Sequence, residues 1–191
     1  MDRDHLRLSR IGLLEEPYPN WFAAAMERIM PPGAPPLKLF RAIATSQRAW
    51  DKFAAGSLLD KGPLPLRERE IVILRTCARC GCGYEWGIHA ALFATRAGLS
   101  EARLADTAAT AIDPSLWSGA EAALLHSVDA LADRKQLTDM EFAALCAYFA
   151  SEQILEIIQL VAFYTGVSMI CGALDLKPEA GTPALPQGAT A

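Results

Sequence analysis

The chain has 191 residues, of which 52% are hydrophobic and 21% are charged, and its net charge at neutral pH is −4. This length fits one domain built around one core. The acidic balance, with no stripe of basic residues interleaved with aromatic ones, excludes a typical nucleic-acid-binding surface. No uninterrupted apolar stretch of about eighteen residues is present, so we expect no membrane partner.

The N-terminal residues 1–5 are mostly charged and lack the apolar centre of a signal peptide, so the sequence predicts a cytoplasmic protein. An odd number of cysteines in such a chain argues against a framework of structural disulfides, and a disulfide here is expected to be a chemical step. The cysteines are Cys77, Cys80, Cys82, Cys146 and Cys171.

In chain order, residues 1–20 predict an entry segment rich in turns, and helical patterns follow it. Stretches rich in proline and glycine at 31–36 and 62–65 separate the first helices. The predicted helices cover residues 21–30, 37–55 as one or two helices, 66–78, a segment with Glu85 and His89 that ends near 97, 101–109, 114–132, 138–149 and 151–174.

No alternating apolar pattern typical of a strand survives across five residues, so the fold class is all-α, a compact multi-helix bundle. Residues 1–176 are expected to form a single helical domain with its core at 37–175. Residues 177–191 are rich in proline, glycine and alanine and are expected to form a flexible C-terminal tail.

Three reactive side chains share one face of the helix that follows Gly81. Around an ideal helix, which turns by about 100° per residue, Glu85 lies about 60° and His89 about 20° from Cys82. Glu70 lies at the start of an apolar, and therefore buried, helix. The predicted catalytic residues are Glu70, Cys82, Glu85 and His89.

These residue types can transfer protons or act as a nucleophile. Glu85 and His89, four residues apart on a helix, can form a proton-transfer pair. Burial favours the acid form of Glu70 unless His89 or Arg75 pairs with it. Cys82, near a helix start and an imidazole, is placed to form a thiolate. A zinc site from Cys77, Cys80, Cys82 and His89 is disfavoured, because their side chains diverge along the helix.

The pattern of Glu70 followed by Cys82-x-x-Glu85-x-x-x-His89, with Tyr84-Glu85-Trp86-Gly87 inside it, resembles the carboxymuconolactone decarboxylase family and its relative alkylhydroperoxidase D. The resemblance spans about residues 37–110 and, more loosely, 154–174. It implies an alkylhydroperoxidase D-like bundle, a small-molecule substrate, no cofactor or metal, and a homo-oligomer that is a trimer or a hexamer.

One position departs from the family's redox pattern. In the peroxidase relatives the motif is Glu, then Cys-x-x-Cys-x-x-x-His, and its two thiols form the redox pair. In this chain Glu85 stands in place of the second cysteine. A dithiol cycle between positions 82 and 85 is therefore impossible, whereas the acid/base residues are all retained.

Three functions stay open on the sequence. The first is a lyase: a cofactor-free decarboxylase in which Glu70, Glu85 and His89 relay protons beside Cys82, which lines the pocket, and which acts on a small carboxylated lactone or a related metabolite. The second is an antioxidant oxidoreductase, a thiol peroxidase with peroxiredoxin activity that uses Cys82 as the redox thiol and Cys80 or Cys77 as the resolving thiol. The third is a non-catalytic protein that binds a small ligand.

Overall fold

The computed structural model describes residues 8–186, and every regular element in this range is a helix. The all-α prediction is therefore confirmed. The α-helices are α1 (Asn20–Ile29), α2 (Lys38–Ile43), α3 (Gln47–Ala55), α4 (Leu66–Arg79), α5 (Gly83–Phe93), α6 (Glu101–Asp106), α7 (Gly119–Arg134), α8 (Asp139–Cys146) and α9 (Ser151–Leu174), and a short 3-10 helix, η2 (Pro114–Leu116), precedes α7.

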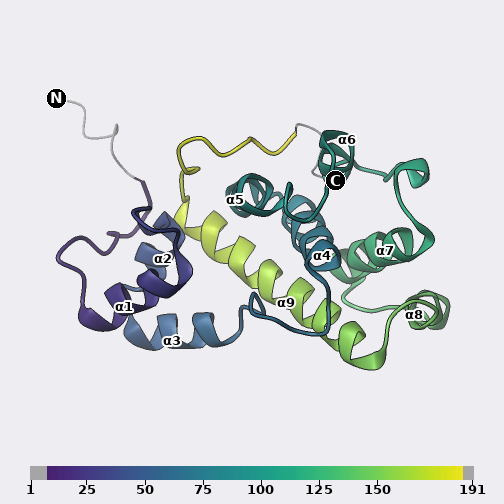
Figure 1. Ribbon diagram of the computed structural model, residues 1–191, viewed down its shortest axis with the longest axis horizontal. Coiled ribbons are helices and arrows are strands. Elements are labelled where there is room, and N and C mark those ends of the chain that lie inside the picture. The colour runs from purple at the N-terminus through teal and green to yellow at the C-terminus, as the bar shows by residue number, and fades with distance from the viewer. Residues whose placement is uncertain (1–7, 187–191) are drawn as a thin grey trace.

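Helices α4 and α9 form the centre of the bundle. The long helix α9 crosses the molecule in Figure 1, with α4, α5 and α7 along one side of it and α1, α2 and α3 grouped near its C-terminal half. Nine consecutive residues of α4, from Glu70 to Ala78, are buried. A helix that is buried all round must carry any polar side chain into the core, and this is how Glu70 comes to lie inside the protein.

The predicted helices occur, with breaks that local signals explain. The 37–55 region is two helices, because the Ser46 hydroxyl caps α3 by accepting a hydrogen bond from the Ala49 amide. The 114–132 region is interrupted at Ser118, which forms a capping box with Glu121 and so starts α7 afresh. Helix α5 ends at Phe93, four residues earlier than predicted.

A buried arginine fixes α4 against α7. Arg75 is fully buried, and its guanidinium forms two hydrogen bonds to the carboxylate of Asp129, at 2.7 and 2.8 Å. It also donates to the backbone carbonyls of Thr107 and Ala109. Because these acceptors occupy the guanidinium, Arg75 is not the partner of Glu70 that the sequence allowed.

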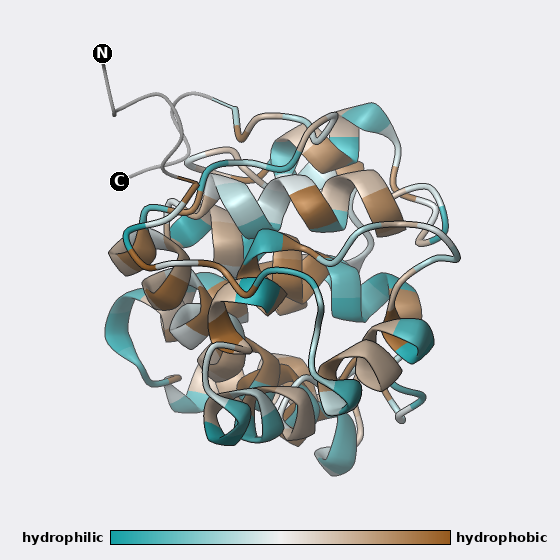
Figure 2. Ribbon diagram, turned by 90° about the vertical axis from the view of Figure 1, so that its left-hand side faces the viewer, coloured by the Kyte–Doolittle hydropathy of each residue, from teal (hydrophilic) through white to brown (hydrophobic). Residues whose placement is uncertain are grey.

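Helix α9 is long and apolar enough to cross a membrane by length and composition alone, although charged and polar residues interrupt its apolar sequence. In this fold it is a core helix, since Ile157, Leu160 and Tyr164 are buried within the bundle. Figure 2 shows the mixed character of the helices, in which hydrophobic and hydrophilic bands alternate along the ribbon. Such banding is typical of helices with one face toward a core.

The described part of the C-terminal segment, residues 177–186, leaves α9 and passes over α5 (Figure 1). Its Glu179 accepts a hydrogen bond of 2.6 Å from the Tyr84 hydroxyl. A side chain at Gly87 would come within 2.7 Å of the Pro183 carbonyl oxygen, so this glycine permits the close approach. Residues 1–7 and 187–191, and the predictions that fall on them, lie outside the described range.

Candidate active site

Three helices meet at a buried row of polar side chains. His89 on α5 lies between Glu70 on α4 and Tyr164 on α9, and all three are at most 3% exposed. The Nδ1 atom of His89 is 2.7 Å from Oε2 of Glu70, and its Nε2 atom is 3.0 Å from the Tyr164 hydroxyl oxygen. Glu70 and His89 thus lie within hydrogen-bonding distance, as expected, and Tyr164 forms a second hydrogen bond to the imidazole.

The hydrogen bonds indicate how the imidazole is oriented. With Nδ1–H donating to the Glu70 carboxylate, Nε2 of a neutral imidazole accepts a hydrogen bond from the Tyr164 hydroxyl. Burial raises the pKa of Tyr164 well above its usual value, and the nearby charge of Glu85 adds to this effect. The phenol therefore keeps its proton and remains a donor at neutral pH.

Glu70 has a second partner. Its Oε1 atom accepts a hydrogen bond of 3.2 Å from Nε of Arg69, whose NH1 group donates to the backbone carbonyl of Leu59. The carboxyl group is thus paired on both oxygens, with His89 on one side and Arg69 on the other. The sequence allowed either His89 or Arg75 as a partner of Glu70. The structure has His89 as one partner, and the arginine that pairs with Glu70 is Arg69 instead of Arg75.

Glu85 is the carboxyl group that is poised to exchange a proton. Its Oε2 atom is 3.8 Å from Nε2 of His89, and its buried Oε1 atom has no hydrogen-bond partner within the described residues. Burial raises the pKa of Glu85 to about 7, His89 opposes this shift, and negative charge on Cys82 and Glu179 reinforces it. A pKa near working pH suits a general acid or base.

A cavity of about 540 Å³ opens beside this carboxyl group, within the usual size range of small-molecule sites. Glu85, His89 and Tyr164 contribute to its wall. The rest is mostly apolar and aromatic, and includes Leu37, Leu39, Phe40, Trp50, Phe53, Ile88, Leu92, Phe93, Phe163 and Val167. Glu85, His89 and Tyr164 therefore face a cavity whose wall suits a small apolar or aromatic molecule.

Arginines add positive charge to the same wall. Arg28 and Arg96 line the cavity, as do Arg69 and Asp60. Arg96 lies over the ring of Phe93 at 5.7 Å, and that ring in turn stacks on the His89 imidazole with centroids 5.2 Å apart. Within residues 8–186, neither Arg28 nor Arg96 is ion-paired with a carboxylate. Both guanidinium groups can thus receive an anionic group from a ligand.

Cys82 lies at the N-terminal cap of α5, and it is not one of the residues that line the cavity. The expectation that it lines the pocket is therefore wrong. A hydrogen bond from the Cys171 thiol lowers the pKa of Cys82 to about 6, and the backbone amides of Glu85 and Tyr84 act in the same direction against the effect of burial. Cys82 is thus placed apart from the cavity wall that Glu85 and His89 share.

The other cysteines are placed differently. All five cysteines are free thiols in this structure. Cys80 is exposed and lies 3.9 Å from the Thr165 hydroxyl, and burial raises the pKa of Cys77 well above its usual value. The cysteine with the largest influence on the pKa of Cys82 is Cys171, which lies 89 residues further along the chain and is singled out by no local pattern in the sequence.

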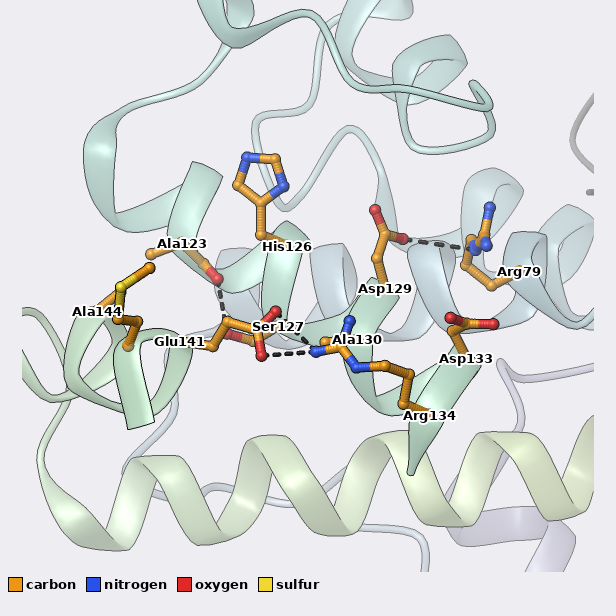
Figure 3. Close-up of a pocket in the computed structure, with 11 residues that line it drawn as sticks. Arg79, Ala123, His126, Ser127, Asp129, Ala130, Asp133, Arg134, Glu141 and Ala144 are labelled. Atoms are coloured by element: carbon orange, nitrogen blue, oxygen red, sulfur yellow. Dashed lines mark hydrogen bonds and ion pairs between the residues drawn. The ribbon is translucent and has the colours of Figure 1, made fainter. Parts of the chain in front are cut away.

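A second cavity, of about 510 Å³, lies between α7, α8 and the end of α4 (Figure 3). Four of its charged side chains lie in pairs: Arg134 forms two hydrogen bonds with Glu141, and Asp129 faces Arg79 at 3.6 Å. Figure 3 shows His126 on the wall apart from these pairs. This cavity holds none of the predicted catalytic residues.

Metal-ligating residues do not cluster in the part of the chain that the structure describes: no group of three or more His, Cys, Asp or Glu side chains is arranged to hold an ion there. Cys77, Cys80, Cys82 and His89, the set considered for zinc, are included in that range.

Comparison with known proteins supports the motif. Residues 44–126 match the model of the carboxymuconolactone decarboxylase family. An uncharacterized peroxidase-related protein from Silicibacter sp. TM1040 is 15% identical, with a TM-score of 0.73, 93% of this chain covered and 95% of that one. A comparison with curated proteins found no match.

Two other solved structures show the same fold. The alkylhydroperoxidase AhpD core protein from Ralstonia eutropha JMP134 is 17% identical, with a TM-score of 0.67, 91% of this chain covered and 93% of that one. A protein of unknown function from Agrobacterium tumefaciens that bears the name AhpD is 22% identical, with a TM-score of 0.66, 73% of this chain covered and 96% of that one. Residues 44–126 are thus similar to the carboxymuconolactone decarboxylase family, and the chain has an alkylhydroperoxidase D-like fold, as its motif indicated.

Proposed function

We propose that this protein is a cofactor-free acid/base enzyme of the decarboxylase kind, acting on a small carboxylated lactone or a related metabolite. The observation that carries the proposal is the state of Glu85, a buried carboxyl group on the wall of a cavity that can hold such a molecule. Its pKa is raised to about 7, and one of its oxygens has no hydrogen-bond partner among the described residues. Perturbed acids that face a pocket are typical of catalytic sites.

The chemistry needs a proton donor more than a cofactor. Loss of carbon dioxide from a carboxylate conjugated through a double bond leaves a delocalised carbanion, which must be protonated at carbon. Glu85 in its acid form delivers that proton, and the carboxylate that results is next to the His89 imidazole, 3.8 Å away. His89 is in turn held in orientation by Glu70 and Tyr164.

The arginines of the cavity support an anionic substrate. Arg28 and Arg96 have no carboxylate partner within the described residues, and a carboxylate of the ligand can take that place. The aromatic wall, with Phe93 stacked between Arg96 and His89, suits a flat unsaturated ring. The charge of the substrate is thus bound at the arginines while its reacting carbon lies toward Glu85.

The test uses 4-carboxymuconolactone, the compound that the family's name points to, in deuterated water. We expect release of carbon dioxide and incorporation of deuterium at carbon, both lost in Glu85→Gln and retained in Glu101→Gln, which removes an exposed acid on α6. Equal activity in Glu85→Gln would contradict the proposal. Absence of both reactions with this lactone and with related carboxylated lactones would favour the non-catalytic binding alternative.

A thiol peroxidase is the second candidate, and the observation in its favour is Cys82. A pKa lowered to about 6 makes this sulfur largely a thiolate at neutral pH, which is the reactive form. Repeated turnover of hydrogen peroxide with dithiothreitol as reductant, lost in Cys82→Ser, would support this activity. A protein that consumes no peroxide beyond one equivalent per chain would exclude it.

Self-association is the remaining part of the proposal. Met140 and Tyr148 near α8, and Leu155 and Met169 on α9, are large apolar side chains that are more than half exposed. Exposed apolar side chains on neighbouring helices suit burial against another copy. Light scattering of the purified protein is expected to give the mass of a trimer or a hexamer, and a monomer at micromolar concentration would contradict this.

A further inference from the structure

The first turn of α2 is capped by residues from distant parts of the chain. Leu37, at the N-cap position, forms no side-chain hydrogen bond, so the first amides of the helix need acceptors from elsewhere. The Glu179 carboxylate accepts a hydrogen bond of 2.6 Å from the Lys38 amide. The Tyr84 hydroxyl accepts one of 3.0 Å from the Leu39 amide. The start of α2 is therefore held by the C-terminal segment and by α5.

Glu179 links these two acceptors to each other. The carboxylate oxygen that accepts from the Lys38 amide, Oε1, also accepts a hydrogen bond of 2.6 Å from the Tyr84 hydroxyl. The Lys38 ammonium lies 3.2 Å from the other carboxylate oxygen, and it donates to the carbonyl oxygens of Lys177 and Pro178. The side chains of Lys38 and Glu179 are only 15% and 19% exposed, so these contacts are little screened by water. One carboxylate thus joins α2, α5 and the C-terminal segment.

The C-terminal segment lies on the side of α5 that faces away from the cavity. Around an ideal helix Gly87 is about 160° from both Glu85 and His89, which line the cavity. A Cβ atom at Gly87 would be 2.7 Å from the Pro183 carbonyl oxygen, so the segment rests directly on the helix at this glycine (Figure 1). None of residues 177–186 is part of the cavity wall. Helix α5 is therefore held between the cavity and this segment.

The turn that Glu179 caps is itself part of the cavity wall. Leu37, Leu39 and Phe40 line the cavity. The Phe40 ring packs edge-on against Trp50, another wall residue, with ring centroids 5.5 Å apart. A shift of the first turn of α2 would therefore move three wall side chains together and disturb a fourth.

We propose that Glu179 is a positioning residue of the candidate site, which fixes the α2 wall against α5 from outside the cavity and so sets how tightly a ligand is bound. His89, in contrast, is held by Glu70 and Tyr164 on α4 and α9. The wall and the acid/base groups thus depend on different contacts. Loss of Glu179 is therefore expected to weaken binding and to keep proton transfer, an expectation for catalysis that rests on the proposed decarboxylase function.

Two variants of the full chain break these contacts in different ways. Glu179→Leu removes both acceptor oxygens. Gly87→Ala keeps Glu179 but places a methyl group 2.7 Å from the Pro183 carbonyl, so the segment must move, while alanine itself favours the helix. Glu179→Gln is the conservative variant, because it retains an oxygen that can accept both hydrogen bonds. Lys177→Gln is the matched control, since it removes a charge of the same segment whose side chain pairs with Asp175.

Hydrogen exchange measured by mass spectrometry reports on α2 without any substrate. We expect the amides of residues 37–43 to exchange about tenfold faster in Glu179→Leu and Gly87→Ala, because loss of a helix cap favours opening of the first turn. In Glu179→Gln and Lys177→Gln they should stay within about twofold of the wild type, and the amides of α7 should be unchanged throughout. With the lactone as substrate, Glu179→Leu and Gly87→Ala should raise KM about tenfold and keep kcat within about twofold.

Unchanged exchange at residues 37–43 in both Glu179→Leu and Gly87→Ala would overturn the inference. Faster exchange with an unaltered KM, or a fall in kcat at constant KM, would overturn it as well. Circular dichroism reports the fold of each variant, and Gly87→Ala decides the matter if Glu179→Leu unfolds. A wild type that does not turn over the lactone counts against the decarboxylase proposal alone, because the exchange experiment contains no substrate and still decides whether Glu179 fixes α2.

Discussion

The first two turns of α5 carry two reactive regions with different surroundings. Glu85 and His89 face a cavity, and one oxygen of Glu85 has no partner among the described residues. Cys82, three residues before Glu85, is held by amides, a hydroxyl and the Cys171 thiol, and does not reach the cavity. One helix thus presents acid/base groups to a ligand and keeps its thiol against the core.

The difference shows what the glutamate at position 85 changes. The peroxidase motif has a cysteine there, whereas in this chain the side chain is a carboxyl group whose pKa is near neutrality. Burial, rather than the charge of a neighbour, is the main cause of the raised pKa. The cavity-facing position thus carries an acid whose pKa suits proton transfer, whereas Cys82 does not line the cavity.

The largest effect on activity is expected at the cavity side. Glu85→Gln keeps the size of the side chain and removes its proton, so kcat for deuterium incorporation into the lactone should fall by about 10²- to 10⁴-fold. Steady-state kinetics measure this loss, with Glu101→Gln as the control. A change smaller than threefold would mean that Glu85 is not the donor.

The same residue is expected to make stability depend on pH. The folded protein holds the Glu85 proton with a pKa of about 7, against 4.5 for an ordinary glutamate, so unfolding releases a proton between these values. The free energy of unfolding therefore falls as pH rises from 4.5 to 7, by about 3 kcal/mol in total. Urea unfolding of the wild type and Glu85→Gln at several pH values measures it, and identical profiles would contradict the raised pKa.

His89→Gln breaks the row of hydrogen bonds from Glu70 to Tyr164. Loss of the imidazole removes the polar group beside the Glu85 carboxyl group and leaves Glu70 and Tyr164 without their shared partner, so we expect kcat to fall by about 10- to 100-fold. The fall should be smaller than in Glu85→Gln. Unaltered kcat with a folded protein would show that the imidazole takes no part.

The arginines at the cavity are expected to affect binding more than chemistry. Arg96→Gln should raise KM for a carboxylated lactone by about tenfold and leave kcat nearly unchanged, because the guanidinium meets the substrate in the ground state and the transition state alike. Arg48→Gln removes an exposed arginine on α3 and is the matched control. A loss of kcat at constant KM would place Arg96 in the chemistry instead.

The smallest change is expected in the pKa of Cys82, which does not face the cavity. Cys171→Ala removes the hydrogen bond that contributes most to the low pKa of Cys82, so that pKa should rise above about 6. Titration of the thiolate absorbance, with Cys146→Ser as the control, measures the rise. An unchanged or lower pKa of Cys82 in Cys171→Ala would show that the two thiols do not interact in this way.

Much of the fold follows from local patterns. Apolar periodicity and end signals place α4 and α9 within one residue of their observed ends, because these long helices repeat their signal over several turns. Ser118 and Glu121 form a capping box that starts α7, whereas the predicted helix runs through 114–132 without a break at this position. The end of α5 near Phe93 had no such local mark.

The sequence predicts only part of the site. Glu85 and His89 share a helix, so their spacing alone predicts that they meet. Tyr164 and Cys171 belong to a helix far along the chain, and only the packing of α9 against α5 brings them to His89 and Cys82. The separation of Cys82 from the cavity depends on the same packing and on the hydrogen bonds of its sulfur, which no spacing rule describes.

The central claim is that Glu85 is a protonated acid beside the cavity near neutral pH, and infrared spectroscopy tests it most directly. The carboxylic acid stretch of a buried glutamate, identified as the band that disappears in Glu85→Gln, should titrate with a midpoint near pH 7. A midpoint near 4.5, the ordinary value for a glutamate, would contradict the account.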